Sequence, residues 1–592
     1  MRITGTDFDK IEIVNLLLIS LAAAVVPMIV YLRLAGLSIE AMHFWGTIIN
    51  IDFYSFYKMI TLLFLGIILF ITFAIYIIRY NYRWTYYYIP LIIYGIMAVI
   101  STAFAEYQRI AIVGAPDRYE NVFLILVYIF LTIAGINMVK NRDSARFVLG
   151  AIFISSLLLG IHGFMQFLGL DLFEVGLVKR LITPEGLEFY VDFHFSSFLG
   201  EGRIYSTMYN PNFVGSYGAM LVSLTLGFYF SIRERRKKAM MGALSVLLFA
   251  YLLGSQSRAG MVGLMAGLLL LVIILRRTLI RNWRSTVIIF LAFIIVFVGM
   301  DVYSVDDIMD EIIRPVVEPD LKEEELTVPA VKDIETEDNL LRIKTGASDI
   351  NIVKGGGNFD VQDEEGNSLS MVIVDRDAGQ KRPVEEEYQE HYFQFDRENS
   401  MLSWQYDNLN AEFKYNNGEY YLQGMNNEFF RVDKDIPRWG FEGYEGLGSS
   451  RGYIWSRSLP MLTDTLLLGK GPDTYGLYFP QEDVVGKLLH MNEPKMRVDK
   501  PHNKFIQIAF NTGVVSLVSM MVLWAGYFLQ GISLYWKPDT EDWRVRTGVA
   551  VMAAVAAYLV TGIFNDSVVS VAPVFWVLLG IGISMNIRYR RG

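Results

Sequence analysis

Apolar residues in this chain are gathered into blocks of about 20 residues, separated by shorter polar segments. A helix rises about 1.5 Å per residue, so one such block can cross the roughly 30 Å hydrocarbon core of a bilayer. The pattern therefore predicts an all-α polytopic membrane protein with about twelve transmembrane helices. The predicted spans are centred on residues 11–33, 57–78, 85–104, 122–139, 147–169, 213–231, 239–254, 260–275, 286–304, 513–535, 546–563 and 569–586.

Basic residues fall in alternate connections between these spans. They are Arg79 and Arg83; Lys140, Arg142 and Arg146; Arg233, Arg235, Arg236, Lys237 and Lys238; Arg276, Arg277, Arg281 and Arg284; Arg544 and Arg546; and Arg588, Arg590 and Arg591. Short translocated loops exclude Lys and Arg, so these connections and both termini should be cytoplasmic. The first apolar block is full-length and is followed by Tyr31-Leu32-Arg33 rather than a cleavage site, so we expect it to remain as an anchor.

Two predicted outward loops are long, at about 170–212 and 305–512. The second begins with an acidic stretch: 26 Asp and Glu residues but only 10 Lys and Arg residues lie between 305 and 400, which accounts for the net charge of −9. Its middle portion alternates polar and apolar positions and contains the turn sequences Asn416-Asn417-Gly418 and Glu365-Gly366-Asn367. We therefore predict an inserted extracytoplasmic β-rich module, antiparallel and at about 335–435.

Beyond this module, apolar residues recur at near-helical spacing, which predicts an amphipathic helix on the membrane surface. These residues are Ile454, Trp455, Leu459, Leu462 and Leu466. The expected organisation has four parts. They are a membrane domain of nine spans (1–304), a loop with the acidic β-rich module (305–450), the amphipathic helix with a candidate catalytic segment (451–512), and three final spans (513–592).

Composition and motifs exclude several kinds of catalytic and cofactor chemistry. The chain has no cysteine, which excludes disulfides, thiolate catalysis and iron–sulfur ligation. No zinc-binding or EF-hand pattern is present, and Asp375-Arg376-Asp377 reads as a turn at a strand end. Lys354-Gly355-Gly356-Gly357 lacks the spacing of a phosphate-binding loop. We therefore expect no metal, no nucleotide, no other cofactor and no nucleic-acid partner.

Three outward segments carry candidate chemistry, because an ionisable residue beside a span is costly and persists mainly when it is paired or used. They are GRIYSTMYNPNF (202–213), which precedes the sixth span, GSQSRAG (254–260), a short turn between the seventh and eighth spans, and PHNKF (501–505), which precedes an apolar helix.

Each segment also has a structural interpretation. Arg203 can extend toward the membrane surface, and Asn212 in Asn210-Pro211-Asn212 can be a helix N-cap. Residues 255–260 can form a tight hairpin, although Arg258 at an outward turn runs against the positive-inside bias. Gly263 and Gly267 are best interpreted as a close helix contact.

His502 is one of six histidines and follows a helix-breaking proline. At a helix N-terminus the positive end of the helix dipole lowers an imidazole pKa, which suits a neutral base. A lone histidine at such a place is more often a capping or packing residue. His194, near Arg203 in sequence, is the second candidate, whereas His391 and His490 look like ordinary loop residues.

Taken together and in this order, GRIYSTMYNPNFVGSYGAML, GSQSRAGMVGLMAG, RGYIWSRSLPMLTDTLLLGKGPDTYG and PHNKFIQIAFNTGVVSL resemble the O-antigen ligase and polymerase superfamily of membrane glycan ligases. The resemblance covers roughly residues 200–525. Members transfer a glycan from undecaprenyl pyrophosphate to an acceptor hydroxyl at the outer face of the bacterial cytoplasmic membrane, without a metal or a nucleotide sugar. The acceptor can be a glycan, a lipid or a protein, and membrane lipid surrounds the enzyme.

The resemblance also implies roles for individual residues. Arg203 and Arg258 match the arginines that hold the donor pyrophosphate, and His502 matches the histidine that activates the acceptor. Residues with less settled roles precede the histidine: Arg451, Asp464, Lys470, Gly471, Asp473 and Tyr475. Nearby polar residues complete the expected substrate-binding set: Asn210, Asn212, Ser257 and Asn503. The acidic β-rich module has no counterpart in the simplest ligases, which leaves the acceptor open.

The chemistry is consistent with these residue types. Guanidinium groups can stabilise a leaving pyrophosphate in place of a metal, and a neutral imidazole can take the acceptor's proton. A ligase and a polymerase of lipid-linked repeat units both fit. A transporter or flippase for the same lipid-linked glycan is the alternative from another class, but it should show internal repeats and charged midplane residues, which are not evident here. A sensor built around the β module would leave the arginines and the histidine unexplained.

Overall fold

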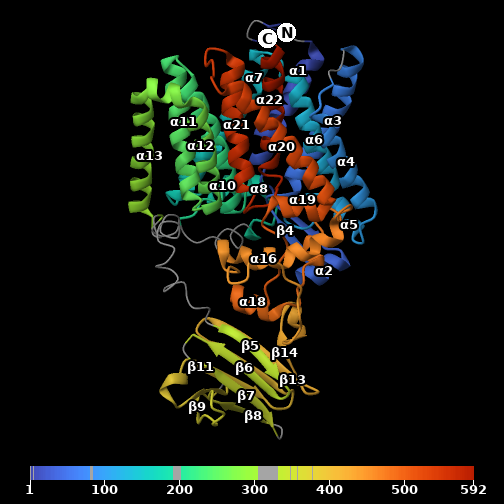
Figure 1. The fold of residues 1–592 in the computed structure, drawn as a ribbon, viewed down its shortest axis with the longest axis vertical. Helices are drawn as coiled ribbons and strands as arrows, with labels where there is room; N and C mark the ends of the chain where they lie inside the picture. Colours follow the sequence, from blue (N-terminus) through green and yellow to red (C-terminus); the bar gives the residue numbers. More distant parts are fainter. Residues whose placement is uncertain are drawn as a thin grey trace.

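The computed structural model describes residues 9–80, 84–190, 202–304 and 331–591, except 347, 356, 357 and 377, together with Ile308 and two short strands, β1 (Arg2–Ile3) and β2 (Thr6–Asp7). His194 lies outside the described residues. Long helices form a membrane domain, and the strands of the β-rich module lie beyond one end of it (Figure 1). We call this the module-side end. The other, far end carries the start of the first long helix and the end of the last (Figure 1).

Ten of the described helices are long and apolar enough to cross a membrane, which confirms a polytopic membrane protein. They are α1 (Lys10–Ala24, with the 3₁₀ turn η1, Val26–Met28), α3 (Phe56–Arg79), α7 (Arg142–Phe167), α10 (Pro211–Ser231), α11 (Arg235–Gly254), α12 (Arg258–Arg281), α13 (Trp283–Tyr303), α20 (Val514–Tyr535), α21 (Trp543–Thr561) and α22 (Ala572–Arg591). The two other predicted spans coincide with shorter apolar helices, α4 (Tyr88–Ala103) and α6 (Val122–Met138).

The centre of the membrane domain is built from α10, α21 and α22, whose apolar windows are 89%, 78% and 83% buried, whereas α13 is only 11% buried at the periphery (Figure 1). Small residues permit the close approach of these helices. A Cβ on Gly263 would lie 2.2 Å from Thr561 Cγ2, and one on Gly267 would lie 2.2 Å from Ser223 Oγ. The predicted close contact at this glycine pair is confirmed.

Short elements cover the module-side end. They are α2 (Ile39–Trp45), α5 (Gln108–Val113), α8 (Gly176–Ile182), α16 (Leu447–Met461), α17 (Tyr475–Tyr478), α18 (Val484–Met491), α19 (Lys504–Thr512), the hairpin β3 (Arg33–Gly36) and β4 (Ile49–Asp52), and the 3₁₀ turns η2 (Leu172–Glu174) and η6 (Leu462–Thr465). The predicted amphipathic helix is α16, which ends at Met461, before Leu462 and Leu466. Its apolar residues Ile454 and Trp455 are buried, and Trp455 Nε1 donates to the carbonyl of Pro501 (2.9 Å). The helix thus supports the segment that carries His502.

The β-rich module contains two antiparallel sheets in sequence order. One consists of β5 (Val331–Glu337), β6 (Leu340–Thr345), β7 (Ile350–Gly355) and β8 (Asn358–Gln362). The other consists of β9 (Met371–Asp375), β10 (Gln380–Pro383), β11 (His391–Asp396), β12 (Met401–Tyr406), β13 (Leu409–Asn416), β14 (Glu419–Gln423) and β15 (Phe429–Arg431), with the 3₁₀ turns η4 (Glu386–Tyr388) and η5 (Met425–Asn427). Asn417 (φ 52°) and Gly418 (φ 89°) form the β13–β14 turn, as predicted. The predicted β-rich module is confirmed.

Two histidines differ from the prediction that they lie in ordinary loops. His391 is fully buried in β11, where its Nδ1 accepts from Trp404 Nε1 (3.1 Å) and its Nε2 pairs with Ser348 Oγ (3.0 Å). The alternation His391, Phe393, Phe395 places the imidazole on the strand face that carries the aromatic rings. His490 belongs to helix α18 and lies against Tyr453. Both histidines are structural.

Candidate active site

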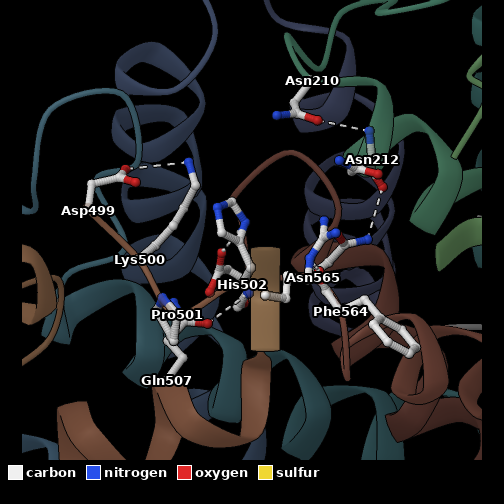
Figure 2. A network of polar contacts seen from close by, with 12 residues as sticks. Asn210, Asn212, Asp499, Lys500, Pro501, His502, Gln507, Phe564 and Asn565 are labelled. Atoms are coloured by element: carbon white, nitrogen blue, oxygen red, sulfur yellow. Dashed lines mark hydrogen bonds and ion pairs between the residues drawn. The ribbon is translucent and has the colours of Figure 1, made fainter. Parts of the chain in front are cut away.

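Hydrogen bonds and the loop between α21 and α22 connect the three predicted segments at the module-side end. Figure 2 shows the first and third of these segments with that loop. Asn210 and Asn212 lie at the start of α10, Ser257 precedes α12, and Asn565 lies in the loop between α21 and α22. Ser257 Oγ donates to Asn212 Oδ1 (3.0 Å), and Asn565 Nδ2 donates to the Asn212 carbonyl (3.2 Å). Segments more than 300 residues apart are therefore joined at one asparagine.

The helix cap of α10 differs from the expected one. Asn210, not Asn212, is the N-cap: its Oδ1 accepts from the Asn212 backbone N–H (2.8 Å), and Pro211 occupies the first helical position. Since a proline has no N–H to satisfy, the cap falls one residue before it. The Asn212 side chain is thereby left to bind Ser257.

Glycines allow α10 and α12 to approach closely beside this network. A Cβ on Gly260 would lie 2.8 Å from Gly215 Cα, and one on Gly215 would lie 2.3 Å from Ser257 Cβ. Neither position has room for a larger side chain. The hydrogen bond between Asn212 and Ser257 therefore depends on both glycines.

His502 lies one residue before the N-cap of α19. The cap is Asn503, whose Oδ1 accepts from the N–H groups of Phe505 (2.9 Å) and Ile506 (3.1 Å). His502 itself has φ 48°, a left-handed backbone conformation that is uncommon outside glycine. About a third of the His502 side chain (32%) is exposed. Asn503, which the sequence predicts to bind substrate, caps the helix that follows.

The sequence interpretation missed Asp566, which faces His502. Its Oδ2 lies 3.6 Å from His502 Nδ1, and its side chain is fully buried. Neither carboxylate oxygen has a hydrogen-bond donor among the described residues. The backbone N–H of the next residue, Ser567, donates to Gln507 Oε1 (2.8 Å), which ties this loop to α19. The sequence offers one indication of this residue: Asp566 is an acidic residue in a short loop predicted to lie on the same side of the membrane as His502.

Positive groups surround this His–Asp pair. Lys500 Nζ lies 3.4 Å from Asp499, next to His502 in Figure 2. Arg118 is buried and lies 3.3 Å from Asp473, whose carboxylate also accepts from the N–H groups of Ala115 and Glu120. Asp473, one of the residues matched by motif, thus anchors the 115–120 loop beside the site.

These charges shift the pKa of the site groups. Burial, together with Lys500, Arg451 and Arg118, lowers the pKa of His502 to about 3. Burial raises the pKa of Asp566 despite the nearby cations. The shift of His502 has the expected direction, but its main cause is desolvation rather than a helix dipole. The imidazole is therefore neutral near pH 7.

Three arginines lie on the segments that meet around the site. Arg203 Nε donates to Gln256 Oε1, and the N–H of Ile204 donates to the Gly254 carbonyl (2.8 Å), so this segment lies on the turn that carries Arg258. Arg451 Nε donates to the carbonyl of Phe564 (3.0 Å), two residues before Asp566. Burial and the charge of Arg258 lower the pKa of Arg451. The two guanidinium groups therefore lie in one region.

Lys470 and Tyr475 contact other parts of the molecule. Lys470 lies 4.0 Å from Asp464 and 5.5 Å from the Tyr478 ring. The Tyr475 hydroxyl is buried and pairs with Ser458 Oγ (2.6 Å). Gly471 (φ 102°) provides the turn between them. Hydrogen-bond and ring contacts join Tyr475 to α16 and α19, and the charges of Asp566 and Asp499 also act on it.

A cavity of about 230 Å³ lies beside the site and includes Tyr209 of the first segment. Its lining combines aromatic rings with carboxylates and an amide: Trp45, Tyr54, Tyr190, Tyr209, Asp52, Asp117 and Asn50. The charges of Lys500 and Asp499 act on Asp117, which places the cavity next to the His502 segment. Aromatic faces with polar edges are suited to sugar rings and hydroxyl groups.

Lys58 is a second residue that the sequence interpretation missed. It lies in α3, is fully buried, and donates to the Thr207 carbonyl and to Ser570 Oγ (3.0 Å). It therefore joins α3 to the first segment and to the loop that carries Asp566. A lysine inside an otherwise apolar predicted span was the available signal.

Among the described residues, no group of three or more His, Asp or Glu side chains could hold a metal ion. Comparisons with protein-family models, with curated proteins and with solved structures found no match.

Proposed function

We propose that this chain is a glycosyltransferase of the O-antigen ligase and polymerase type. It transfers a glycan from a polyprenyl pyrophosphate, undecaprenyl pyrophosphate in a bacterial cytoplasmic membrane, to an acceptor hydroxyl at the extracytoplasmic face. The observation that carries the proposal is the neutral His502 beside the buried Asp566, with Arg258 and Arg451 in the same region. A base and a cationic leaving-group site are the two requirements of this reaction.

In the proposed reaction the acceptor oxygen forms a bond to the anomeric carbon, and the bond from that carbon to the pyrophosphate oxygen breaks. The electron pair remains on the pyrophosphate, where the guanidinium groups of Arg203 and Arg258 stabilise its charge. In the reacting complex the His502 imidazole moves onto Asp566 Oδ2, which lies 3.6 Å from Nδ1 here, so that Nδ1 keeps a proton and Nε2 takes the proton of the acceptor hydroxyl. The imidazolium then releases that proton to water.

The cavity lined by Asn50, Asp117 and Tyr209 gives this reaction a place for sugar rings next to the base. Polar groups that bind hydroxyls reject analogues lacking them, so the cavity determines which glycan is accepted. The acidic β-rich module lies beyond the same end of the membrane domain (Figure 1).

The test is a reaction of the purified, reconstituted protein with a polyprenyl-pyrophosphate oligosaccharide, read as a gel ladder of products. A ladder that forms without added acceptor and requires His502 identifies a polymerase. Transfer that appears only with a supplied lipid, wall or protein acceptor identifies a ligase. His502→Ala is the inactive variant, and His43→Ala is the matched control because His43 is exposed and lies outside the site.

Absence of transfer with every acceptor would overturn the proposal. Movement of the same lipid-linked glycan across vesicles by such an inactive preparation would indicate a transporter.

A further inference from the structure

The far end of the membrane domain contains a pocket of about 430 Å³ between four helices. It lies where α7, α11 and α21 begin and α10 ends, opposite the β-rich module (Figure 1). Its mouth carries five basic side chains, Arg142, Arg146, Arg233, Lys237 and Arg546, and one acid, Glu234. This pocket is distant from the candidate active site and is not used by the proposed reaction.

Three of the five basic side chains have an acidic partner: Lys237 pairs with Glu234, Arg146 with Asp143 and Arg233 with Glu541. Among the described residues, no ion pair joins Arg142 or Arg546 to an acid. Arg146 lies 3.5 Å from Asp143 and Arg233 lies 2.6 Å from Glu541, and both are surface pairs with more than 45% of the arginine side chain exposed. Such exposed pairs contribute little. Around Arg546, the like charges of Arg142 and Arg146 act against the acidic charges of Glu541 and Asp542. An anion bound among Arg142, Arg146 and Arg546 would relieve the repulsion among these like charges.

The backbone adds a further donor. Helix α11 begins at Arg235 with Glu234 as its N-cap, and no side chain accepts from its first N–H groups. The helices α7 and α21, by contrast, are capped by Asn141 and Asp542. An uncapped helix start lined by basic residues is suited to phosphate oxygens.

The inner walls of the same pocket are apolar. They are formed by Leu149, Phe153, Phe228, Ile232 and Met241. Phe153 lies eleven residues after Arg142 on α7, which is about 16 Å deeper along the helix. There its ring meets that of Phe228 edge to face, 5.7 Å apart. The mouth of the pocket is therefore cationic, and its inner walls are suited to contact with hydrocarbon chains.

We propose that this pocket binds an anionic phospholipid, with its headgroup phosphate on Arg142 and Arg546 and an acyl chain against Phe153 and Phe228. A free phosphate would use the mouth but not the apolar walls. A zwitterionic lipid would use the walls but would leave the excess positive charge uncompensated. Basic pockets between membrane helices are a recurrent form of anionic lipid recognition.

The test measures lipids retained by the full-length protein in native mass spectrometry, after exchange from nanodiscs that contain equal amounts of phosphatidylglycerol and phosphatidylcholine. The wild type should retain phosphatidylglycerol preferentially. The double variant Arg142→Gln/Arg546→Gln should bind it about 25-fold more weakly, since each basic residue contributes roughly a factor of five. The matched control is Arg277→Gln/Arg281→Gln, which removes two exposed arginines from α12 at the same end.

A second measurement locates the bound lipid, because Trp543 lines the pocket. Phosphatidylglycerol brominated on its acyl chains should quench tryptophan fluorescence more strongly in the wild type than in Trp543→Phe, and inorganic phosphate should not displace it. Equal retention of the two lipids, equal loss in the two double variants, or displacement by inorganic phosphate would each overturn the proposal. Unchanged thermal unfolding of the double variants in phosphatidylcholine verifies that they are folded.

Discussion

The two ends of the membrane domain hold positive charge in different ways. At the module-side end, Arg203, Arg451 and Arg118 each donate to or pair with a particular group on another segment. At the far end, Arg142, Arg146 and Arg546 crowd one another at the mouth of an apolar pocket. The cations at the module-side end are held in fixed orientations by specific partners. The cations at the far end contribute mainly a positive electrostatic potential.

This comparison predicts that substitutions at the module-side end depend strongly on side-chain geometry. Removal of a positioned general base costs about 10²–10⁴-fold. We expect this loss of transfer for His502→Ala, measured as the initial rate with the lipid-linked donor. Asp566→Asn should cost about 10–100-fold, because the contact proposed between Nδ1 and the carboxylate in the reacting complex would have the value of a hydrogen bond to a charged group.

The two substitutions should not be additive, because Asp566 acts through the imidazole. The double variant His502→Ala/Asp566→Asn should be no slower than His502→Ala alone. Additive losses would show that Asp566 acts independently of His502 and would break the proposed pair.

A second prediction concerns Arg258. Arg258→Gln should reduce transfer by about 10²–10³-fold, the usual cost of removing one donor to a developing negative charge. Arg258→Lys should restore only part of the rate, since a lysine keeps the charge but not the bidentate geometry. Arg109→Gln is the matched control, because Arg109 is an exposed arginine in α5 on the same side of the molecule. Equal activity of Arg258→Lys and the wild type would show that Arg258 acts through its charge alone and not through its hydrogen-bond geometry.

The third prediction is a pH profile. A general base acts in its neutral form, and the lowered pKa of His502, about 3, keeps the imidazole neutral throughout the range from pH 8 to pH 5. An imidazole with the ordinary pKa of about 6.5 would lose roughly thirtyfold in its neutral fraction by pH 5. The transfer rate of the wild type should therefore show no decline centred near pH 6.5.

Lys500→Gln sharpens this measurement. Removal of the ammonium group takes away a charge that lowers the pKa of His502, so the acid limb should move to higher pH. A limb near pH 6.5 in the wild type, unchanged in Lys500→Gln, would contradict the depressed pKa.

Much of this architecture could be predicted from sequence because it depends on repeating patterns. Apolar blocks located the membrane helices, and the pair Asn417-Gly418 located a hairpin turn, since few residues adopt positive φ. The segments around Arg203, Arg258 and His502 were found because polar residues beside apolar spans are unusual.

The remaining parts depend on contacts between distant segments. Asp566 stands alone in a short loop, and only the approach of that loop to α19 gives it a partner. His391 was misassigned as a loop residue although the alternation with Phe393 and Phe395 placed it in a strand. Lys58 was overlooked because one lysine hardly changes the hydropathy of a 24-residue helix. Each error concerns a single polar residue whose partners belong to another helix, strand or loop.

The smallest expected effect is on transfer by a variant of the far end of the membrane domain. Arg142→Gln/Arg546→Gln should change the transfer rate less than twofold in phosphatidylcholine vesicles, because no step of the proposed reaction uses the far end. The same double variant should lose its preference for phosphatidylglycerol. This one variant would then distinguish the lipid-binding cations of the far end from the cations that act in transfer. A loss of transfer as large as that of Arg258→Gln would show that the far end is coupled to the site through α10 or α21, the helices that lead from the basic pocket to Asn212 and to the loop of Asp566.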